Sequence, residues 1–101
     1  MIREYAIYQC PVSVNYCFRS FDEAKDKWDI FDYVHVYRGT VESETISEAL
    51  EKLFYIFNVD RPSDFYGRSM SVSDVVRLSD ENERNNYYYC DIFGWSECPK
   101  E

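Results

Sequence analysis

The stretch 60–78 reads DRPSDFYGRSMSVSDVVRL and is the most locally specified part of the chain. Pro62 cannot continue a helix, so a helix that precedes the stretch must end there. Asp64 can close an Asx turn, and Gly67 can take a positive φ that most residues avoid. The β-branched and aliphatic residues at its end predict a strand that starts near Asp74. The stretch therefore predicts a helix end, a tight connection and a strand.

The residues before this stretch predict the main helix. Thr45 followed by Glu48 has the form of a capping box, and Asn58 is a plausible stop signal. Between them apolar residues recur at helical spacing, which predicts one wide face packed on a sheet. That face consists of Ile46, Ala49, Leu50, Leu53, Phe54 and Phe57.

The remaining segments complete an α+β pattern. Strands are expected at 5–10, where Pro11 ends the strand or places it at a sheet edge, and at 33–38, where Gly39 turns the chain. Ser20 with Glu23 predicts a short helix that runs to Trp28. The polar run 80–86 predicts a hairpin loop with a return strand at 87–93. We expect one domain over 1–101, with a mostly antiparallel sheet of about four strands and two helices packed on one face.

Composition narrows the classes of partner. The net charge is −8 and the pI is near 4.6, which argues against nonspecific binding to nucleic acid or to an anionic membrane. The N-terminal sequence has no apolar run long enough for a signal peptide or a spanning helix, so we expect a cytoplasmic protein with reduced thiols. An acidic protein of this kind is expected to bind a protein partner with a basic surface, or to use its charge only for solubility.

The sequence offers little catalytic chemistry. The cysteines, Cys10, Cys17, Cys90 and Cys98, form no CxxC pair, and the only histidine, His35, has no nucleophile or carboxylate at motif spacing. We therefore expect no enzymatic activity, no metal and no cofactor, and we expect His35 to be a surface or half-buried structural residue. The tyrosines at 87–89 could form a base-stacking platform, but without a rim of Lys and Arg they are expected to flank a core.

The negative charge is concentrated between residues 20 and 51. This segment holds nine acidic and three basic residues, a net charge of −6. If the two helices lie on the same side of the sheet, their carboxylates would form one continuous acidic surface that could occupy a basic nucleic-acid groove. The alternative is an ordinary pair of solvated helix faces. The residues predicted to bind a partner are Asp22, Asp26, Asp29, Glu44, Glu48 and Glu51.

The second half of the chain resembles the signature of the YodL-like domain. The matching residues are Pro62, Asp64, Phe65, Gly67, Ser69, Ser71, Val72, Ser73, Asp74, Val75 and Val76, followed by Tyr88, Tyr89, Asp91, Phe93, Gly94 and Trp95. The resemblance implies that these residues determine the fold, with Asp74 and the serines satisfying turn amides and Gly67 taking a special backbone angle. Arg61 and Arg68 are expected to pair with nearby carboxylates.

Domains of this family occur in proteins of bacterial mobile elements and phages, and the resemblance implies no enzymatic activity. Together with the acidic charge, it suggests an anti-defence protein, in particular an anti-CRISPR inhibitor of a Cas9-type nuclease. The alternatives are a protein-interaction module that serves conjugation or replication of the mobile element and, with less support, an enzyme that attacks the guide RNA. A homodimer through an edge strand at 5–10 is also open.

Overall fold

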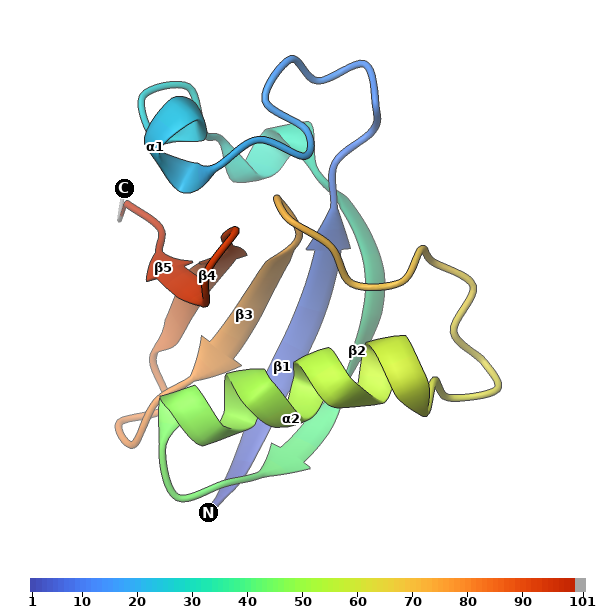
Figure 1. The fold of residues 1–101 in the computed structure, drawn as a ribbon. Coiled ribbons are helices and arrows are strands. Elements are labelled where there is room, and N and C mark those ends of the chain that lie inside the picture. Colours follow the sequence, from blue (N-terminus) through green and yellow to red (C-terminus); the bar gives the residue numbers. More distant parts are fainter. Residues whose placement is uncertain (100–101) are drawn as a thin grey trace.

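An antiparallel sheet of five strands forms the centre of the structure, a computed structural model that describes residues 1–99 (Figure 1). The strands lie in the order β2-β1-β3-β4-β5. In chain order the elements are β1 (Ile2–Gln9), α1 (Phe21–Ala24), the 3-10 helix η1 (Ile30–Asp32), β2 (Val34–Glu42), α2 (Ile46–Val59), β3 (Val75–Ser79), β4 (Asn85–Cys90) and β5 (Trp95–Glu97). The α+β class is confirmed.

The fifth strand comes from a turn inside the predicted return strand. Strand β4 ends at Cys90, and the amide of Asp91 donates to the carbonyl of Gly94 at 2.9 Å. Gly94 has a φ of 78°, a left-handed angle that glycine adopts without a Cβ penalty. The chain then returns as β5, so the single strand expected at 87–93 is the end of one hairpin arm and the turn that follows it.

Strand β1 lies inside the sheet, between β2 and β3. Of the two alternatives for Pro11, the strand end is confirmed and the edge strand at 5–10 is wrong, since the edges of the sheet are β2 and β5. Pro11 is compatible with the inner position because β1 ends at Gln9, so no ladder hydrogen bond is required from the proline.

Residue alternation divides the sheet into two faces, each with its own core. Ile7 pairs with Val76, which pairs with Tyr88, and all three belong to the core beneath α2. Their chain neighbours point the opposite way and pack with Tyr16 and Ala24 in a second core. These neighbours are Tyr8, Val75 and Tyr89.

Helix α2 fills the first face as predicted, except that Phe54, which was predicted to belong to its apolar face, is 39% exposed. The hydroxyl of Thr45 accepts a hydrogen bond from the amide of Glu48 at 3.1 Å, which satisfies one free amide of the first turn. Leu53 and Phe57 are fully buried against the sheet, and the ring of Phe57 meets that of Tyr5 edge-on at 6.1 Å. The predicted helix boundaries hold to within a residue, since α2 ends at Val59.

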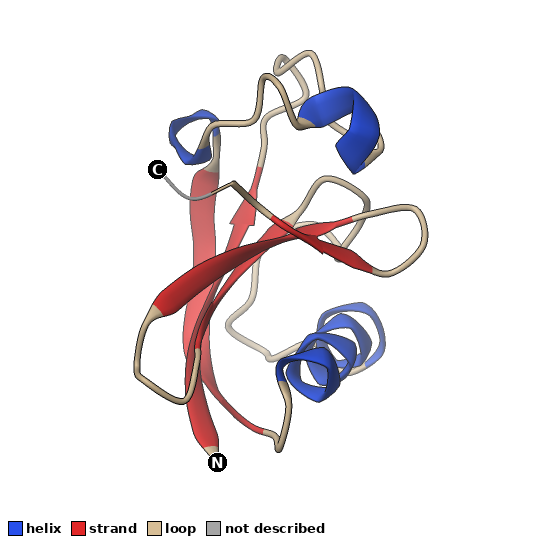
Figure 2. Cartoon of the chain, turned by 90° about the vertical axis from the view of Figure 1, so that its left-hand side faces the viewer, coloured by secondary structure: helices blue, strands red, loops and turns tan. Residues whose placement is uncertain are grey.

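Helix α1 covers the other face, so the prediction of two helices on one face is wrong. Its Phe21 packs on Tyr89 with ring centroids 5.1 Å apart, whereas α2 packs on the side of Tyr88. Figure 2 shows the two helices on either side of the twisted β4–β5 end of the sheet. The helix also ends at Ala24 instead of Trp28, because the chain tightens into a turn in which the amide of Lys27 donates to Ala24.

Two glycines are required for close packing and not for turns. Gly39 lies within β2, opposite Tyr5, and a Cβ at this position would stand 2.8 Å from the Tyr5 hydroxyl. At Gly67 a Cβ would stand 2.8 Å from the ring of Phe65 and 2.9 Å from the side chain of Gln9. The predicted turn at Gly39 and the predicted positive φ at Gly67 are both wrong, since among residues 1–99 the only glycine with positive φ is Gly94.

Candidate functional site

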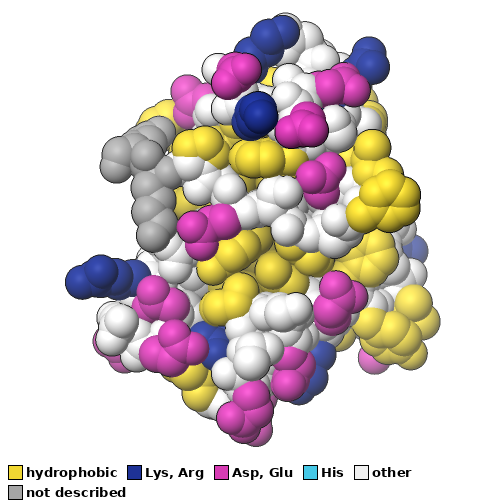
Figure 3. Space-filling model, turned by 60° about the vertical axis from the view of Figure 1, so that its left-hand side comes forward, with side chains coloured by type: hydrophobic (Ala, Val, Ile, Leu, Met, Phe, Trp, Pro, Cys, Tyr) yellow, Lys and Arg dark blue, Asp and Glu magenta, His cyan; other side chains and the backbone are white. Residues whose placement is uncertain are grey.

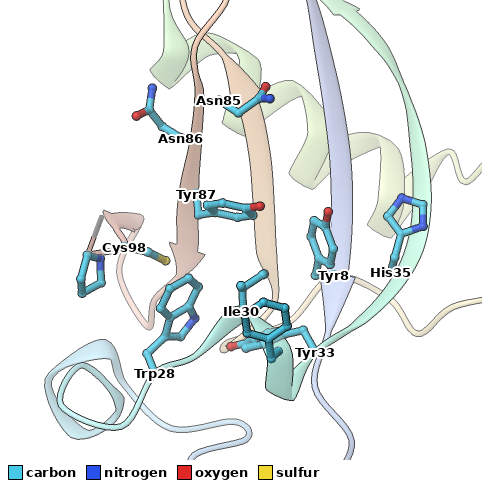
Figure 4. A pocket seen from close by; sticks show the side chains of 11 residues that line it. Tyr8, Trp28, Ile30, Tyr33, His35, Asn85, Asn86, Tyr87 and Cys98 are labelled. Carbon is cyan, nitrogen blue, oxygen red and sulfur yellow. The ribbon is translucent and has the colours of Figure 1, made fainter. Parts of the chain in front are cut away.

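A pocket of about 680 Å³ opens on the sheet face that α2 leaves uncovered (Figure 4). Its floor comes from Tyr8 of β1, His35 of β2 and Tyr87 of β4, whose side chains project from that face. One wall comes from the segment between α1 and β2, with Trp28 and Tyr33 pointing inward. The remaining lining residues are Ile30, Phe31, Asn85, Asn86, Cys98 and Pro99.

The aromatic rings of the pocket touch one another in a chain. Tyr8 lies 5.3 Å from His35 and 6.0 Å from Tyr87, measured between ring centroids. Trp28 continues the chain, at 6.1 Å from Tyr87 and 6.3 Å from Tyr33. These are the separations of tilted and edge-on aromatic pairs. The pocket is therefore lined by a continuous row of aromatic rings from three strands and one loop.

Local hydrogen bonds hold the wall in place. Asp29 caps η1 by accepting the amide of Phe31 at 2.9 Å, and Asp32 accepts the hydroxyl of Tyr16 at 2.9 Å. The hydroxyl of Tyr33 donates to the carbonyl of Ser73 at 2.7 Å, and burial raises the pKa of Tyr33. Phe31, at the tip of η1, is 85% exposed. The wall thus combines fixed carboxylates with an apolar residue at the mouth.

The described lining of the pocket is aromatic and polar but carries no acidic side chain, lysine or arginine. Burial raises the pKa of the Cys98 thiol to about 12, which leaves no thiolate at neutral pH. His35 is exposed, as predicted, and among residues 1–99 no carboxylate hydrogen-bonds to it. Within residues 1–99, no lining side chain of the pocket is hydrogen-bonded as a nucleophile to a general base.

Two cations project from the sheet face that carries the pocket, Arg77 of β3 and Arg38 of β2, which both pair with Ala6. Arg77 pairs with Tyr87 and Ala6 across the sheet and so projects from the same face. Burial raises the pKa of Tyr8, while the charge of Arg77 acts in the opposite direction. The positive charge of Arg77 therefore acts on the floor of the pocket, at Tyr8 and beside Tyr87.

The six carboxylates predicted to bind a partner are all exposed, but they form two groups. Asp22, Asp26 and Asp29 belong to the segment around α1, and Glu44, Glu48 and Glu51 belong to α2 and its N-terminal approach. Because the helices cover opposite sheet faces, the condition for one continuous acidic surface is not met. Figure 3 shows acidic side chains distributed from the top to the bottom of one side of the molecule, interspersed with hydrophobic side chains.

Three of the six carboxylates already have partners in the protein. Asp22 pairs with Lys25 at 3.4 Å, and Glu48 pairs with Lys52 at 3.2 Å. Asp29 caps η1. Such exposed pairs contribute little to stability, so they do not prevent contact with a partner. Their role in binding stays a prediction.

Within the stretch 60–78, Asp74 and Ser73 form a buried network of hydrogen bonds and do not line the pocket. Asp74 is fully buried and accepts from the amide of Ser71 at 2.9 Å, from Gln9 at 3.1 Å and from Arg68 at 3.4 Å. Ser73 is also buried and accepts the amide of Phe18 at 2.9 Å. Asp74 and Ser73 thus satisfy backbone amides, as the resemblance implied.

The two arginines of this stretch behave differently. Arg68 pairs with Asp74, as expected, and also donates to the carbonyl of Cys10 at 3.2 Å. Arg61 instead donates to the hydroxyl of Ser69 at 3.4 Å, and within residues 1–99 it forms no ion pair, so the pairing predicted for it is wrong. All four cysteines are free.

Sequence reasoning did not identify the pocket. The sequence predicts Trp28 as the last residue of a longer α1, and it predicts that the tyrosines at 87–89 flank a core. Tyr88 and Tyr89 do so, but Tyr87 is only half-buried and lines the pocket. The available signal was the alternation of Tyr87 with Tyr88, which places successive rings on opposite faces.

Comparison with known proteins places the chain in a family. The model of the YodL-like domain matches residues 4–100, nearly the whole chain. The chain therefore belongs to the YodL-like domain family, which confirms the resemblance carried by the 60–95 motifs. No curated protein and no solved structure matches it significantly.

Within residues 1–99, no group of His, Cys, Asp and Glu side chains is placed to hold a metal ion. No helix in the same range has the length and apolar character that a membrane span requires.

Proposed function

We propose that this YodL-like domain is a non-catalytic protein-binding module that acts on a partner with a basic surface. Specifically, the partner is a Cas9-type CRISPR effector in a bacterial host cell, and the domain acts as an anti-defence protein. The observation that carries the proposal is the net charge of −8 together with six exposed carboxylates around the two helices. The family resemblance to proteins of mobile elements and phages supports the same assignment.

The mechanism is competition with nucleic acid. An RNA-guided nuclease holds guide RNA and target DNA in positively charged channels and reads a short PAM directly. A rigid acidic domain is steered to such a channel by long-range attraction and excludes the nucleic acid once it is bound. Inhibition by this route requires no bond to be broken and no cofactor.

The separation of the carboxylates into two groups makes the contact surface testable. We expect one group to face the effector and the other to remain in solvent. The first variant carries Asp22→Lys and Asp26→Lys, which leaves the Asp29 cap intact. The second carries Glu44→Lys and Glu51→Lys, which leaves the Glu48–Lys52 pair intact. Both variants change the net charge by the same amount, so each is the control for the other.

The assay is plasmid interference in cells that carry a type II system, with and without each variant. The wild-type domain should restore plasmid uptake and co-purify with the Cas9–guide complex. One variant should lose most of this effect while circular dichroism shows both to be folded. Full inhibition by both variants would rule out the acidic-surface mechanism.

Two outcomes would redirect the assignment. Absence of co-purification and of protection would favour the alternative module, which docks to a relaxase or replication protein of the mobile element. Cleavage of guide RNA after incubation with the pure domain would favour an enzyme. We expect the guide RNA to remain intact, because the described residues of the pocket do not place a nucleophile next to a general base.

A further inference from the structure

The aromatic pocket has a preferred ligand charge. Its ring faces carry the negative part of the aromatic quadrupole, which attracts cations and repels anions. No acidic or basic side chain among the described lining residues offsets this preference. The surrounding segment 26–33 holds three carboxylates, Asp26, Asp29 and Asp32, against one lysine, Lys27. The rings and the wall therefore favour a positive group, and Arg77 and Arg38 of the neighbouring sheet surface act against it.

The size and rim of the pocket favour a side chain presented by a polypeptide. A volume of about 680 Å³ is within the range of sites that hold ligands larger than a simple ammonium ion. Asn85 stands at the rim with an exposed amide that can both donate to and accept from a peptide backbone. Phe31, largely exposed at the mouth, offers apolar contact to the methylene stem of a long side chain.

We propose that the pocket formed by Tyr8, Trp28, Tyr33 and Tyr87 receives a Lys or Arg side chain of the basic protein partner. The inference rests on the proposed function for the existence of that partner, and it adds the site and the chemistry of recognition. The cation stacks against Trp28, because Trp28 comes from the wall of the pocket and not from the sheet surface that carries Arg77. The overall charge of −8 brings the partner to the surface, and the rings select the side chain.

A matched pair of small probes tests the preference for positive charge. Choline and 3,3-dimethylbutan-1-ol have the same shape, but only choline carries a charge. Titration of the full-length domain, followed by Trp28 fluorescence and by amide chemical shifts, should show choline binding about tenfold more tightly. Equal affinity for the two probes, or no binding of either, would overturn the proposal.

Three variants test whether the rings and the local charge are responsible. Tyr87→Leu should abolish the preference for choline, whereas Tyr87→Phe keeps the ring and should retain it. Arg77→Gln removes one neighbouring cation and should raise choline affinity several-fold without changing that of the neutral probe. A purely apolar pocket would not respond to Arg77→Gln, and that result would contradict the electrostatic assignment. Amide spectra confirm that each variant is folded.

A peptide pair distinguishes a protein side chain from a small cationic metabolite. The tripeptide acetyl-Ala-Arg-Ala-amide should bind more tightly than its citrulline counterpart, and at least as tightly as choline. Stronger binding of choline would assign the pocket to a small cation and overturn the protein-side-chain proposal. Because these measurements use only the pure domain, their outcome does not depend on the interference assay. Failure of Cas9 inhibition with intact Arg selectivity would reject the proposed effector and leave the pocket assignment standing.

Discussion

Protonation of Asp74 should control stability in a direction opposite to that of most carboxylates. Burial raises the pKa of Asp74 from 3.8 to about 6, although Ser71, Gln9 and Arg68 all donate to the carboxylate and act to lower it. A raised folded-state pKa means that the folded protein binds the proton more tightly than the unfolded chain. The corresponding stabilisation is complete below pH 3.8 and is lost as the pH rises through about 6.

The size of the effect follows from the pKa values. A rise from 3.8 to about 6 corresponds to about 3 kcal/mol across the whole titration. Between about pH 5 and about pH 7.5 the linkage relation gives a loss of about 1.4 kcal/mol. This interval stays above the pI of about 4.6, where an uncharged protein would tend to precipitate.

Urea unfolding of the wild type and of Asp74→Asn measures this loss. The free energy of unfolding of the wild type, minus that of the variant, should fall by about 1.4 kcal/mol from about pH 5 to about pH 7.5. Subtraction removes the contributions of the other carboxylates. Asp80→Asn is the control, because hydrogen bonds from the amides of Arg84 and Asn82 lower the pKa of Asp80. The stabilisation that ionised Asp80 provides is lost only in acid. The free energy of unfolding of the wild type, minus that of Asp80→Asn, should therefore stay constant in this interval.

The competing possibility is that the three donors outweigh burial and keep Asp74 ionised. In that case the difference between wild type and Asp74→Asn would stay constant or rise with pH. Either result would refute the conclusion that desolvation dominates at this site.

Three substitutions test the packing of the fold by urea unfolding. Arg3→Met should lower the free energy of unfolding by about 2–4 kcal/mol, because the fully buried guanidinium donates to the Ser43 hydroxyl at 2.8 Å and to two backbone carbonyls. An unchanged free energy of unfolding would mean that water replaces these bonds. Gly39→Ala should lower the free energy of unfolding by about 1–3 kcal/mol, because the alanine Cβ would clash with the buried Tyr5 ring. Unchanged stability would show that the Tyr5 ring can move away. Thr45→Ala should cost about 1 kcal/mol through loss of the α2 cap, and Thr45→Ser should restore it.

The parts of the fold that the sequence predicts well depend on local signals. Helix α2 is specified by its Thr45 cap and by an apolar stripe of three turns, all within fifteen residues. The start of β3 is specified in the same way, and the structure places it at Val75. These signals act through neighbouring backbone groups, so no knowledge of distant segments is needed.

The side of the sheet on which α1 packs could not be predicted for a physical reason. Strands that bury only one face show an alternation of apolar and polar residues, and this alternation identifies the inner face. Here both faces are buried near α1, so Val75 and Val76 are both apolar, as are Tyr88 and Tyr89. The pattern therefore indicates burial but not which helix lies on which side.

The pocket depends on strand order, which local patterns do not encode. Tyr8 and Tyr87 are nearly eighty residues apart in the sequence and meet because β3 alone separates β1 from β4. Trp28 reaches them because α1 ends after one turn and the chain doubles back through η1. Charge was visible in the sequence, but the position of that charge relative to the pocket was not.

The two faces of the sheet lead to a test that joins the charge to the pocket. Asp26 and Asp29 flank the pocket wall, whereas Glu44 and Glu51 belong to the α2 side of the sheet. A partner that inserts a cationic side chain between Trp28 and Tyr87 must approach from the α1 side, so Asp26 should contribute to the same contact.

A double-mutant cycle measures this coupling through affinity for the Cas9–guide complex. The double variant with Asp26→Lys and Tyr87→Leu should lose less binding free energy than the two single variants lose together, and the difference should be about 0.5 kcal/mol or more. Glu51→Lys combined with Tyr87→Leu should be additive. Strong coupling of Glu51 instead of Asp26 would place the partner on the α2 face and separate the acidic contact from the aromatic pocket.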